Sequence, residues 1–298
     1  QCQMRILILD LLAERIEFGH GGNIEMIKPF TNSNSEIEVF LVTPQFEKYT
    51  EFERLGFEKI KKENVPEWDD DVDFKSEFSE VIEGTLVKFS RIFTPVGNTE
   101  KISKWIKNHK FSCVYCSGSR RNVSQPEQWM TNAKNLLRGV ILAKKPFLGI
   151  CFGHQLLAET LGGSVTRSSE RTDAVYNLKL TNLGSNDPLF DGLSNNGEGP
   201  ITLYTHQDHV VNISTDQQII IELLGSSEHC KNAAIRARIN DELLPVWGVQ
   251  FHPEASKARI KRSYDLGHIS LEEKESFNRE HDGAQVLENF SKIVCLES

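Results

Sequence analysis

The sequence has no long apolar run, no excess of basic residues and few cysteines, and each absence excludes a class of protein. No apolar stretch reaches the roughly 18 residues that a membrane-spanning helix needs, and no signal-peptide core follows the start, so a soluble, cytoplasmic protein is predicted. The formal net charge is −8 over 298 residues, which disfavours a surface that neutralises nucleic-acid phosphates. A small-molecule partner fits this composition better than nucleic acid or a membrane.

The six cysteines are too few for a disulfide scaffold, and reduced thiols are expected. Cys113 and Cys116 have the spacing of a metal knuckle, but no second Cys/His pair with ligand spacing accompanies them. A second candidate metal set is His206, Asp208 and His209, which crowding on one short segment disfavours. The sequence therefore predicts no metal site and no cofactor.

The pattern of apolar residues predicts an α/β protein. Predicted strands lie at 5–10, 37–43, 111–115 and 146–150, with helical stretches at 23–30 and 126–143 between them. After Gly163 the predicted strands follow one another more closely, at 174–180, 201–204, 219–224, 233–239 and 246–251. We expect one domain over residues 1–298, with a mainly parallel central sheet flanked by helices and a hairpin-rich C-terminal half.

Two segments are predicted to decorate this domain. Residues 63–83 hold nine acidic residues against one lysine, which indicates a solvated surface insertion rather than an acidic docking arm. Residues 255–298 form a C-terminal extension, charged up to residue 282 and closed by a predicted helix at 284–293 that packs on the sheet.

A sharp turn from strand to helix is predicted at Cys151. The apolar run 146–150 leads into Gly149-Ile-Cys-Phe-Gly153, and three leucines then follow at helical spacing. This is the pattern of a nucleophile elbow with cysteine in place of serine, in which the flanking glycines allow backbone atoms to approach closely. A helix N-terminus also favours the reactive thiolate. A buried structural cysteine is the alternative for this motif alone.

The second motif is Val246-Trp-Gly-Val-Gln-Phe-His-Pro-Glu254, an apolar strand that ends in His-Pro-Glu. The period of two places His252 and Glu254 on the same side of the chain. A thiolate nucleophile needs a base that later acts as an acid, and the imidazole needs a carboxylate that fixes its tautomer. Together the two motifs predict that Cys151, His252 and Glu254 form a catalytic set, whereas His154 is predicted to pack at the helix N-terminus.

The paired motifs, 149–155 and 248–254, resemble those of the class I, or triad, glutamine amidotransferases. Within that family, Thr205-His-Gln-Asp-His-Val210 is similar to the His-x-Asp loop of the GMP-synthetase amidotransferase domain and of its stand-alone relatives, which include γ-glutamyl peptidases. The resemblance runs from the first predicted strand to the closing helix. It implies a single flavodoxin-like amidotransferase domain.

By this resemblance, Cys151 attacks the γ-carbonyl of glutamine or a γ-glutamyl compound, forms a γ-glutamyl thioester and releases ammonia or an amine. The backbone N–H groups of Phe152 and Gly118 are implied to hold the oxyanion. Many amidotransferases have Pro-Gly-Gly-Pro where this chain has Cys116-Ser-Gly-Ser119, a form that is similar to the stand-alone relatives.

The resemblance also implies the substrate contacts. Gln155 matches the position that contacts the substrate glutamine. The backbone of Thr205, His206 and Gln207 matches the loop that holds the amino-acid end of that substrate.

Three functions are compatible with the sequence. The first is a stand-alone hydrolase, and the second is a glutaminase subunit that supplies ammonia to a synthetase on a separate chain. The third is a catalytically idle binding protein, which the intact Cys/His/Glu set disfavours. No P-loop or synthetase domain is recognisable in the sequence, so we expect any ammonia-using chemistry to need a partner protein.

Overall fold

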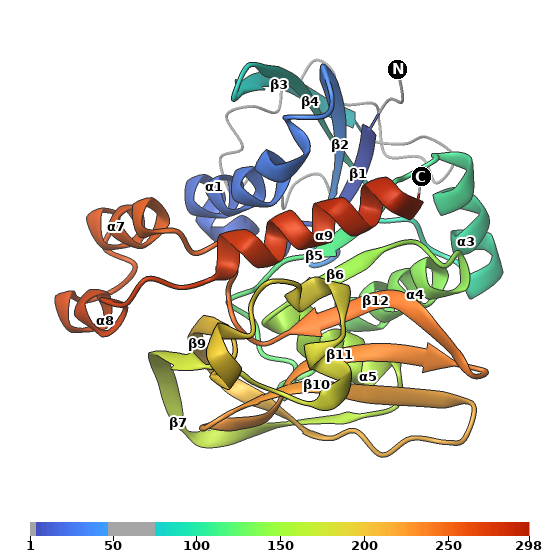
Figure 1. Ribbon diagram of the computed structural model, residues 1–298. Helices are drawn as coiled ribbons and strands as arrows, with labels where there is room; N and C mark the ends of the chain where they lie inside the picture. The colour runs from blue at the N-terminus through green and yellow to red at the C-terminus, as the bar shows by residue number, and fades with distance from the viewer. Residues whose placement is uncertain (1–3, 47–74, 298) are drawn as a thin grey trace. The chain divides into compact units, whose positions relative to one another are not determined.

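The computed structural model describes residues 4–46 and 75–297 and has an α/β fold with mainly parallel strands, as predicted (Figure 1). The chain divides into two compact units. The first comprises residues 1–120 and 126–145, and the second comprises residues 121–125 and 146–298. No helix of the described ranges is long and apolar enough to cross a bilayer.

The first unit is built on five strands. In spatial order these are β3 (Lys75–Ile82), β4 (Thr85–Ile92), β2 (Glu36–Val42), β1 (Met4–Leu9) and β5 (Cys113–Cys116), all parallel except β3. The helices are α1 (Ile16–Ile27), α3 (Thr99–Asn108) and α4 (Trp129–Leu142). The continuous apolar runs of β1 and β2 are buried almost throughout, as expected for parallel strands covered on both faces.

Strand β3 occupies the end of the predicted acidic insertion and forms a hairpin with β4, which follows the insertion. Residues 63–74 of that segment lie outside the described residues, while residues 75–82 pair antiparallel with β4. Glu83 and Gly84 connect the two strands, both with positive φ, 47° and 82°, as a tight two-residue hairpin turn requires. The part of the segment that the structure describes is therefore a paired strand, and exposure alternates along it from residue 77.

The second unit also contains five strands in one sheet. Their order is β6 (Phe147–Ile150), β12 (Glu242–Val249), β11 (Cys230–Ile239), β10 (Ile219–Ser227) and β8 (Lys179–Leu180). Only β6 and β12 pair in parallel within this group, and the others form the antiparallel hairpins that the sequence predicts (Figure 1). The helix α5 (Phe152–Thr160) follows β6 directly, and the short helix α6 (Asn182–Ser185) follows β8.

A separate antiparallel pair, β7 (Ser164–Asn177) and β9 (Ile201–Asn212), completes the second unit. The prediction that Thr205, His206 and Gln207 form a loop is wrong, because all three lie inside β9. Burial alternates along this strand, with His206 and Asp208 buried and Gln207 partly exposed, which is the period of two of a strand. The polar side chains on its buried face concealed that period.

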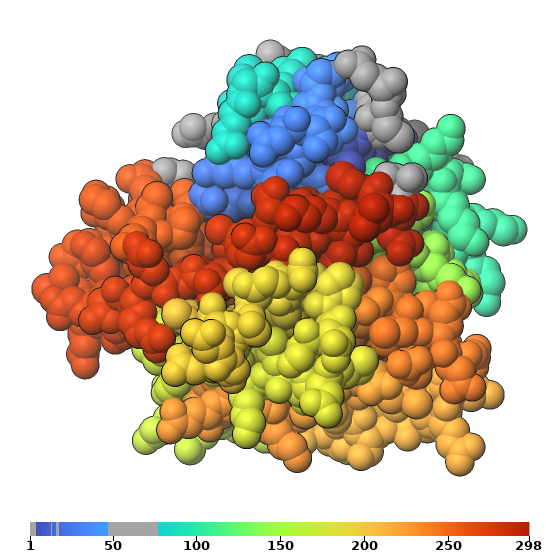
Figure 2. Space-filling view, viewed as in Figure 1, coloured from blue at the N-terminus to red at the C-terminus, as the bar shows by residue number. Residues whose placement is uncertain are grey.

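The C-terminal segment is helical. Two short helices, α7 (Lys257–Asp265) and α8 (Leu271–Ser276), fill most of the charged stretch and form one exposed orange-red group (Figure 2). The Lys274 ammonium lies 4.7 Å from the centre of the Tyr264 ring and joins the two helices. The helix α9 (Gly283–Glu297) covers the predicted closing helix, and its Asn289 amide donates to the carbonyls of Leu189 and Asp191 at 3.0 and 2.9 Å.

Asp187 is the buried polar centre of the second unit. Its carboxylate pairs with Arg236 at 2.8 Å, and it accepts hydrogen bonds from the Trp247 indole at 3.0 Å and from the Leu189 backbone N–H at 2.9 Å. The Arg236 guanidinium lies 4.3 Å from the centre of the Trp247 ring. One carboxylate thus ties β11 and β12 to the segment that contacts α9.

Replacing Asp187 with alanine should destabilise the protein by about 3–5 kcal/mol, because it leaves the Arg236 charge, only 12% exposed, without its carboxylate partner. Urea denaturation followed by circular dichroism measures this change. The matched control is Asp265→Ala, which breaks an exposed pair with Lys261 and should leave the midpoint unchanged. Equal midpoints for the two variants would contradict the role of Asp187.

The buried His154 makes stability depend on pH. Burial lowers the pKa of His154 from 6.5 to about 4, although hydrogen bonds with the backbone of Asn232 and Gly248 act to raise it. The unfolded chain therefore binds a proton below pH 6.5 that the folded chain does not bind until about pH 4. Stability falls as the pH drops through this window.

We expect His154→Gln to flatten this dependence, because glutamine can donate to the Asn232 carbonyl and does not titrate. Between pH 6.5 and 5, the free energy of unfolding of the variant should change less with pH than that of the unmodified protein. The two slopes should differ by up to about 1.4 kcal/mol per pH unit. Urea titrations at several pH values measure it. An unchanged slope would show that His154 is not the group responsible.

Candidate functional site

Cys151 lies at a strained turn at the carboxyl end of β6. Its N–H donates to the Val249 carbonyl at 2.9 Å, and its φ of 54° with ψ of −103° is unusual for a residue with a side chain. A Cβ atom on Gly149 would come within 2.6 Å of the Gly153 carbonyl oxygen, so only glycine fits there. The chain therefore forms the strand-to-helix turn predicted from its motif, with Cys151 as the N-cap residue of α5.

Two groups approach the Cys151 sulfur besides the predicted base. The Gln250 side-chain amide donates to Sγ at 3.4 Å, and the Thr205 carbonyl oxygen lies 3.9 Å from it. The cysteine is 7% exposed. The Cys151 thiol is therefore enclosed by the ends of β6 and β12 and by the middle of β9.

His252 and Glu254 form a close pair beside Cys151. The His252 N–H donates to the Leu203 carbonyl at 2.8 Å, which fixes the backbone, and Nδ1 lies 2.6 Å from the Glu254 carboxylate. The carboxylate can only accept, so Nδ1 carries a proton, and Nε2 is the ring nitrogen that remains for proton transfer. Burial lowers the pKa of His252, but the charges of Glu254 and Cys151 outweigh it and hold that pKa well above its usual range.

Gln155 links this group to β9. Its amide nitrogen donates to the Asp208 carbonyl at 2.9 Å and to the Gln250 side-chain oxygen at 3.1 Å. Because Gln250 in turn donates to Cys151, the two glutamines form one hydrogen-bonded row that ends at the sulfur. No role was predicted for Gln250, although its position two residues before His252 places it on the same side of the strand.

A second row of polar groups supports the Asp208 carbonyl from behind. His206 Nδ1 lies 2.8 Å from that oxygen, His206 Nε2 lies 2.8 Å from His229 Nε2, and His229 Nδ1 lies 3.0 Å from Ser227 Oγ. A carbonyl only accepts, so Nδ1 of His206 donates, His229 donates to His206, and Ser227 donates to His229. Both imidazoles are neutral, in keeping with burial that lowers their pKa to about 2 for His206 and about 4 for His229.

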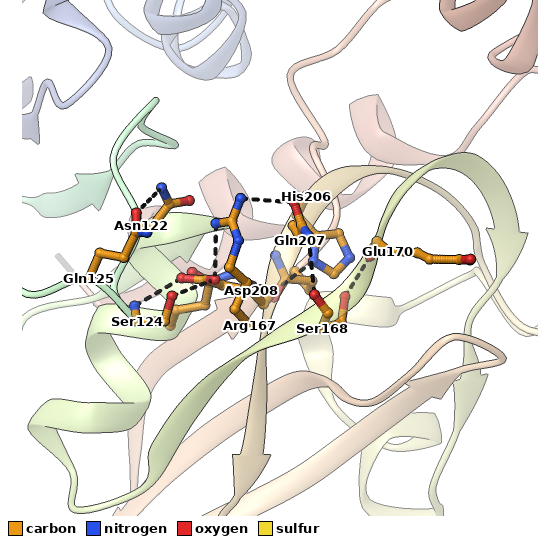
Figure 3. Close-up of polar contacts among 11 residues, drawn as sticks. Asn122, Ser124, Gln125, Arg167, Ser168, Glu170, His206, Gln207 and Asp208 are labelled. Atoms are coloured by element: carbon orange, nitrogen blue, oxygen red, sulfur yellow. Dashed lines mark hydrogen bonds and ion pairs between the residues drawn. The ribbon is translucent and has the colours of Figure 1, made fainter.

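Thr205, His206 and Gln207, which the sequence places at the substrate, have engaged side chains. The Thr205 hydroxyl bonds to Asp173 and Arg171, and the His206 ring is engaged at both nitrogens. Gln207 bonds to Arg167 and to the Ser168 carbonyl (Figure 3). Among these groups, the Thr205 carbonyl is the one that bonds to Cys151. If these residues bind the substrate, they would do so through their backbone N–H and C=O groups.

The carboxylate of Asp208 holds the segment 121–125. It accepts from the Ser124 N–H at 2.9 Å and from the Ser124 hydroxyl at 2.8 Å, while Arg167 lies 3.8 Å away (Figure 3). These contacts with Ser124 and Arg167 occupy the Asp208 carboxylate, which a metal site formed by His206, Asp208 and His209 would need as a ligand. Within residues 4–46 and 75–297, no three His, Cys, Asp or Glu side chains are arranged as metal ligands.

The predicted oxyanion donors lie at two element ends. Phe152 is the first residue of α5, whose N–H groups point toward the helix N-terminus and favour negative charge there. Gly118 follows β5 in the first compact unit, where its carbonyl accepts from the Ser117 hydroxyl at 3.0 Å. The oxyanion roles of both residues stay predictions.

Other thiols and His154 have structural surroundings. Cys113 and Cys116 are buried in β5, and burial raises the pKa of Cys116 far above its ordinary value. Burial also raises the pKa of Cys230 to about 12. His154 is fully buried against the Asn232 carbonyl at 2.9 Å.

Comparison with known proteins identifies the family. The model of the class I glutamine amidotransferases matches residues 71–264. The chain is 29% identical over 192 residues to a glutamine-hydrolyzing GMP synthase from Pyrobaculum aerophilum, an alignment that covers 63% of this chain but only 34% of that protein. It is 36% identical over 145 residues to one subunit of the glutamine-hydrolyzing GMP synthase from Sulfurisphaera tokodaii, covering 48% of this chain and 68% of that one.

The fold agrees with this match. The solved structure of a glutamine amidotransferase from Thermotoga maritima superposes with a TM-score of 0.57 at 17% identity, over the full length of both chains. The match to the family model covers well over half of the chain, and both motifs at Cys151 and His252 fall within it. The chain belongs to the class I glutamine amidotransferases.

Proposed function

We propose that this amidotransferase is a stand-alone cysteine hydrolase that cleaves the γ-amide bond of glutamine or of a γ-glutamyl compound. The observation that carries the proposal is the grouping of Cys151, Gln250, His252 and Glu254 in the second unit, in which Gln250 donates to the sulfur and Glu254 bonds to His252. A nucleophile, a base and a carboxylate that fixes the base are the three parts that nucleophilic acyl transfer needs.

The proposed first step forms a thioester. The Cys151 thiolate attacks the γ-carbonyl carbon, and the negative charge moves to the carbonyl oxygen, which backbone N–H groups such as that of Phe152 would stabilise. The tetrahedral intermediate then collapses and its carbon–nitrogen bond breaks. The protonated Nε2 of His252 gives its proton to the leaving nitrogen, which departs as ammonia or an amine.

The proposed second step returns the enzyme to its starting state. A water molecule attacks the thioester carbon while His252, now neutral, takes a proton from it. The carbon–sulfur bond breaks, glutamate leaves, and the sulfur recovers its negative charge beside the imidazolium. Glu254 holds the ring in one tautomer through both steps, because its 2.6 Å contact to Nδ1 stays in place.

A second candidate function follows from the relatives. Two of them, from Sulfurisphaera tokodaii and Saccharolobus solfataricus, are each one subunit of a glutamine-hydrolyzing GMP synthase and are 36% and 35% identical to this chain over the matched residues. By analogy this chain would hydrolyse glutamine for a synthetase on another polypeptide. The two proposals share the same chemistry at Cys151 and differ in whether the isolated chain is active.

The isolated protein should release ammonia from glutamine, or an amine from γ-glutamyl dipeptides, and Cys151→Ala should abolish the release. The control is Cys295→Ala, which removes an exposed thiol of α9 and should leave the rate unchanged. A coupled glutamate assay measures both. Turnover by Cys151→Ala would overturn the mechanism, and turnover that needs an added synthetase would select the second candidate.

His252 and Glu254 should differ in what their loss costs. His252→Ala removes proton transfer and should lower kcat by about 10²–10⁴-fold. Glu254→Gln keeps the shape and removes the charge that raises the pKa of His252, so we expect a smaller loss of kcat and an acid shift of the pH–rate profile. Steady-state kinetics from about pH 5 to 9 measures both effects. A larger loss for Glu254→Gln would show that the assigned roles are wrong.

A further inference from the structure

Strand β7 bulges beside the strand that touches Cys151. The β7–β9 ladder pairs Arg167 with Asp208 and resumes with Thr172 opposite His206, so residues 168–171 lie opposite Gln207 alone. Figure 3 shows Ser168 and Glu170 in this bulge, with the Glu170 side chain pointing away from the polar cluster. Bulges redirect side chains and are frequent next to active sites.

The end of the bulge directs Arg171 back to β9. Its Nη2 donates to the Thr205 hydroxyl at 2.6 Å, and its Nε lies 3.2 and 3.1 Å from the two carboxylate oxygens of Asp173. The Thr205 hydroxyl donates to Asp173 at 2.6 Å, and Asp173 is the direct partner of Thr205 in the ladder. The three side chains form a closed triangle in which the Nη1 edge of Arg171 makes none of the bonds.

This triangle is connected to the nucleophile through one residue. Thr205 contributes its hydroxyl to the triangle and its carbonyl oxygen to the 3.9 Å contact with the Cys151 sulfur. A positive and a negative side chain are therefore bonded to the same residue that contacts the sulfur. Other groups that contact Cys151 are the Gln250 amide, the Val249 carbonyl and His252.

Stability does not account for this ion pair. The Arg171 side chain is 52% exposed and that of Asp173 is 15% exposed, and ion pairs of such exposure contribute little to folding. Arginine presents a planar fork that suits a carboxylate, and about half of the Arg171 side chain is exposed. An exposed pair of opposite charges beside a nucleophile suits a ligand that itself carries both charges.

We propose that Arg171 binds the α-carboxylate and Asp173 the α-ammonium group of the γ-glutamyl substrate. The inference rests on the proposed function, since it names the part of that substrate which the site selects. In a γ-glutamyl amide the nitrogen of the leaving group is bonded to the γ-carbonyl. A leaving amino acid therefore has no free ammonium group and offers the ion pair only its carboxylate. The glutamyl α-carbon is the one position that carries both an ammonium and a carboxylate, and two methylene groups separate it from the reacting carbonyl.

The experiment compares substrates that differ only in the charge at the α-carbon. The reference substrate is γ-glutamyl-p-nitroanilide, whose leaving group has no charge, and the analogues are its α-carboxamide and its N-acetyl derivative. Arg171→Met should lower kcat/KM for the reference about 10- to 100-fold, mainly through KM, as expected when a charge-assisted hydrogen bond is lost. The same variant should change kcat/KM for the α-carboxamide by less than about threefold.

Asp173→Asn tests the other half of the pair. It keeps an acceptor for the Thr205 hydroxyl and should raise KM for the reference substrate, with little effect on the N-acetyl derivative. The matched control is Arg238→Met, which breaks a half-buried pair with Glu222 at 2.8 Å on β10 and β11 and should leave both substrates unaffected. Thermal melting of each variant monitors folding.

Equal losses for the charged substrate and its neutral analogue would overturn the inference, because a purely structural role affects both alike. The inference would also be overturned if Arg171→Met lowered kcat/KM for γ-glutamylglycine but not for the anilide. Arg171 would then bind a carboxylate of the leaving group. Binding of glutamine to Cys151→Ala and to the double variant Cys151→Ala/Arg171→Met is then compared by calorimetry. This comparison distinguishes a failure of the binding inference from a failure of the proposed hydrolysis. Binding that depends on Arg171 without turnover by the unmodified protein would refute hydrolysis and support the binding role.

Discussion

Parallel hydrogen bonding between β6 and β12 places two strand ends side by side, and the candidate site depends on that register. Ile150 pairs with Val249, so the residues that follow each strand emerge together at the carboxyl edge. Cys151 follows one strand, and Gln250, His252 and Glu254 follow the other. The Cys151 N–H completes the register by bonding to Val249. A slip of one residue would turn His252 and Glu254 to the opposite side.

Around this edge, the direction of each hydrogen bond is set by which atoms can donate and which can only accept. Carbonyl and carboxylate oxygens at Asp208 and Glu254 accept only, which sets the tautomers of His206 and His252. The same site therefore holds one imidazole neutral and another one charged. The difference comes from neighbours: His206 faces a carbonyl and a second imidazole, whereas His252 faces the Glu254 carboxylate and the Cys151 side chain.

The sequence predicts the parts of this site that depend on local pattern. The turn at Cys151 follows from Gly149 and the apolar runs on either side, and the pairing of His252 with Glu254 follows from the period of a strand. Gln250 could have been found by the same period. The β3–β4 hairpin was missed because β3 breaks the usual alternation: Glu80 lies on the less exposed face, where it pairs with His20, whereas the apolar Val81 is exposed.

Contacts that depend on register between distant strands could not be predicted. Arg171 reaches Thr205 because β7 bulges out over residues 168–171, and no local signal in that segment marks the bulge. His229 meets His206 only because β10 and β11 bring their connection to β9, a matter of tertiary packing. The interpretation of 205–207 as a loop was wrong for a related reason. Polar side chains are buried there where apolar ones are usual, because His206 donates to the Asp208 backbone carbonyl and the Asp208 carboxylate accepts from Ser124.

The Gln250 amide has a consequence for the lifetime of the acyl-enzyme in the proposed mechanism. Its hydrogen bond to Sγ is strongest when the sulfur is charged, because ionised acceptors bind donors more tightly than neutral ones. A thioester sulfur is a poor acceptor, so acylation weakens this bond and deacylation restores it. Gln250 would thus make the thiolate a better leaving group. The same amide that stabilises the free thiolate would thus favour the step in which the thioester breaks.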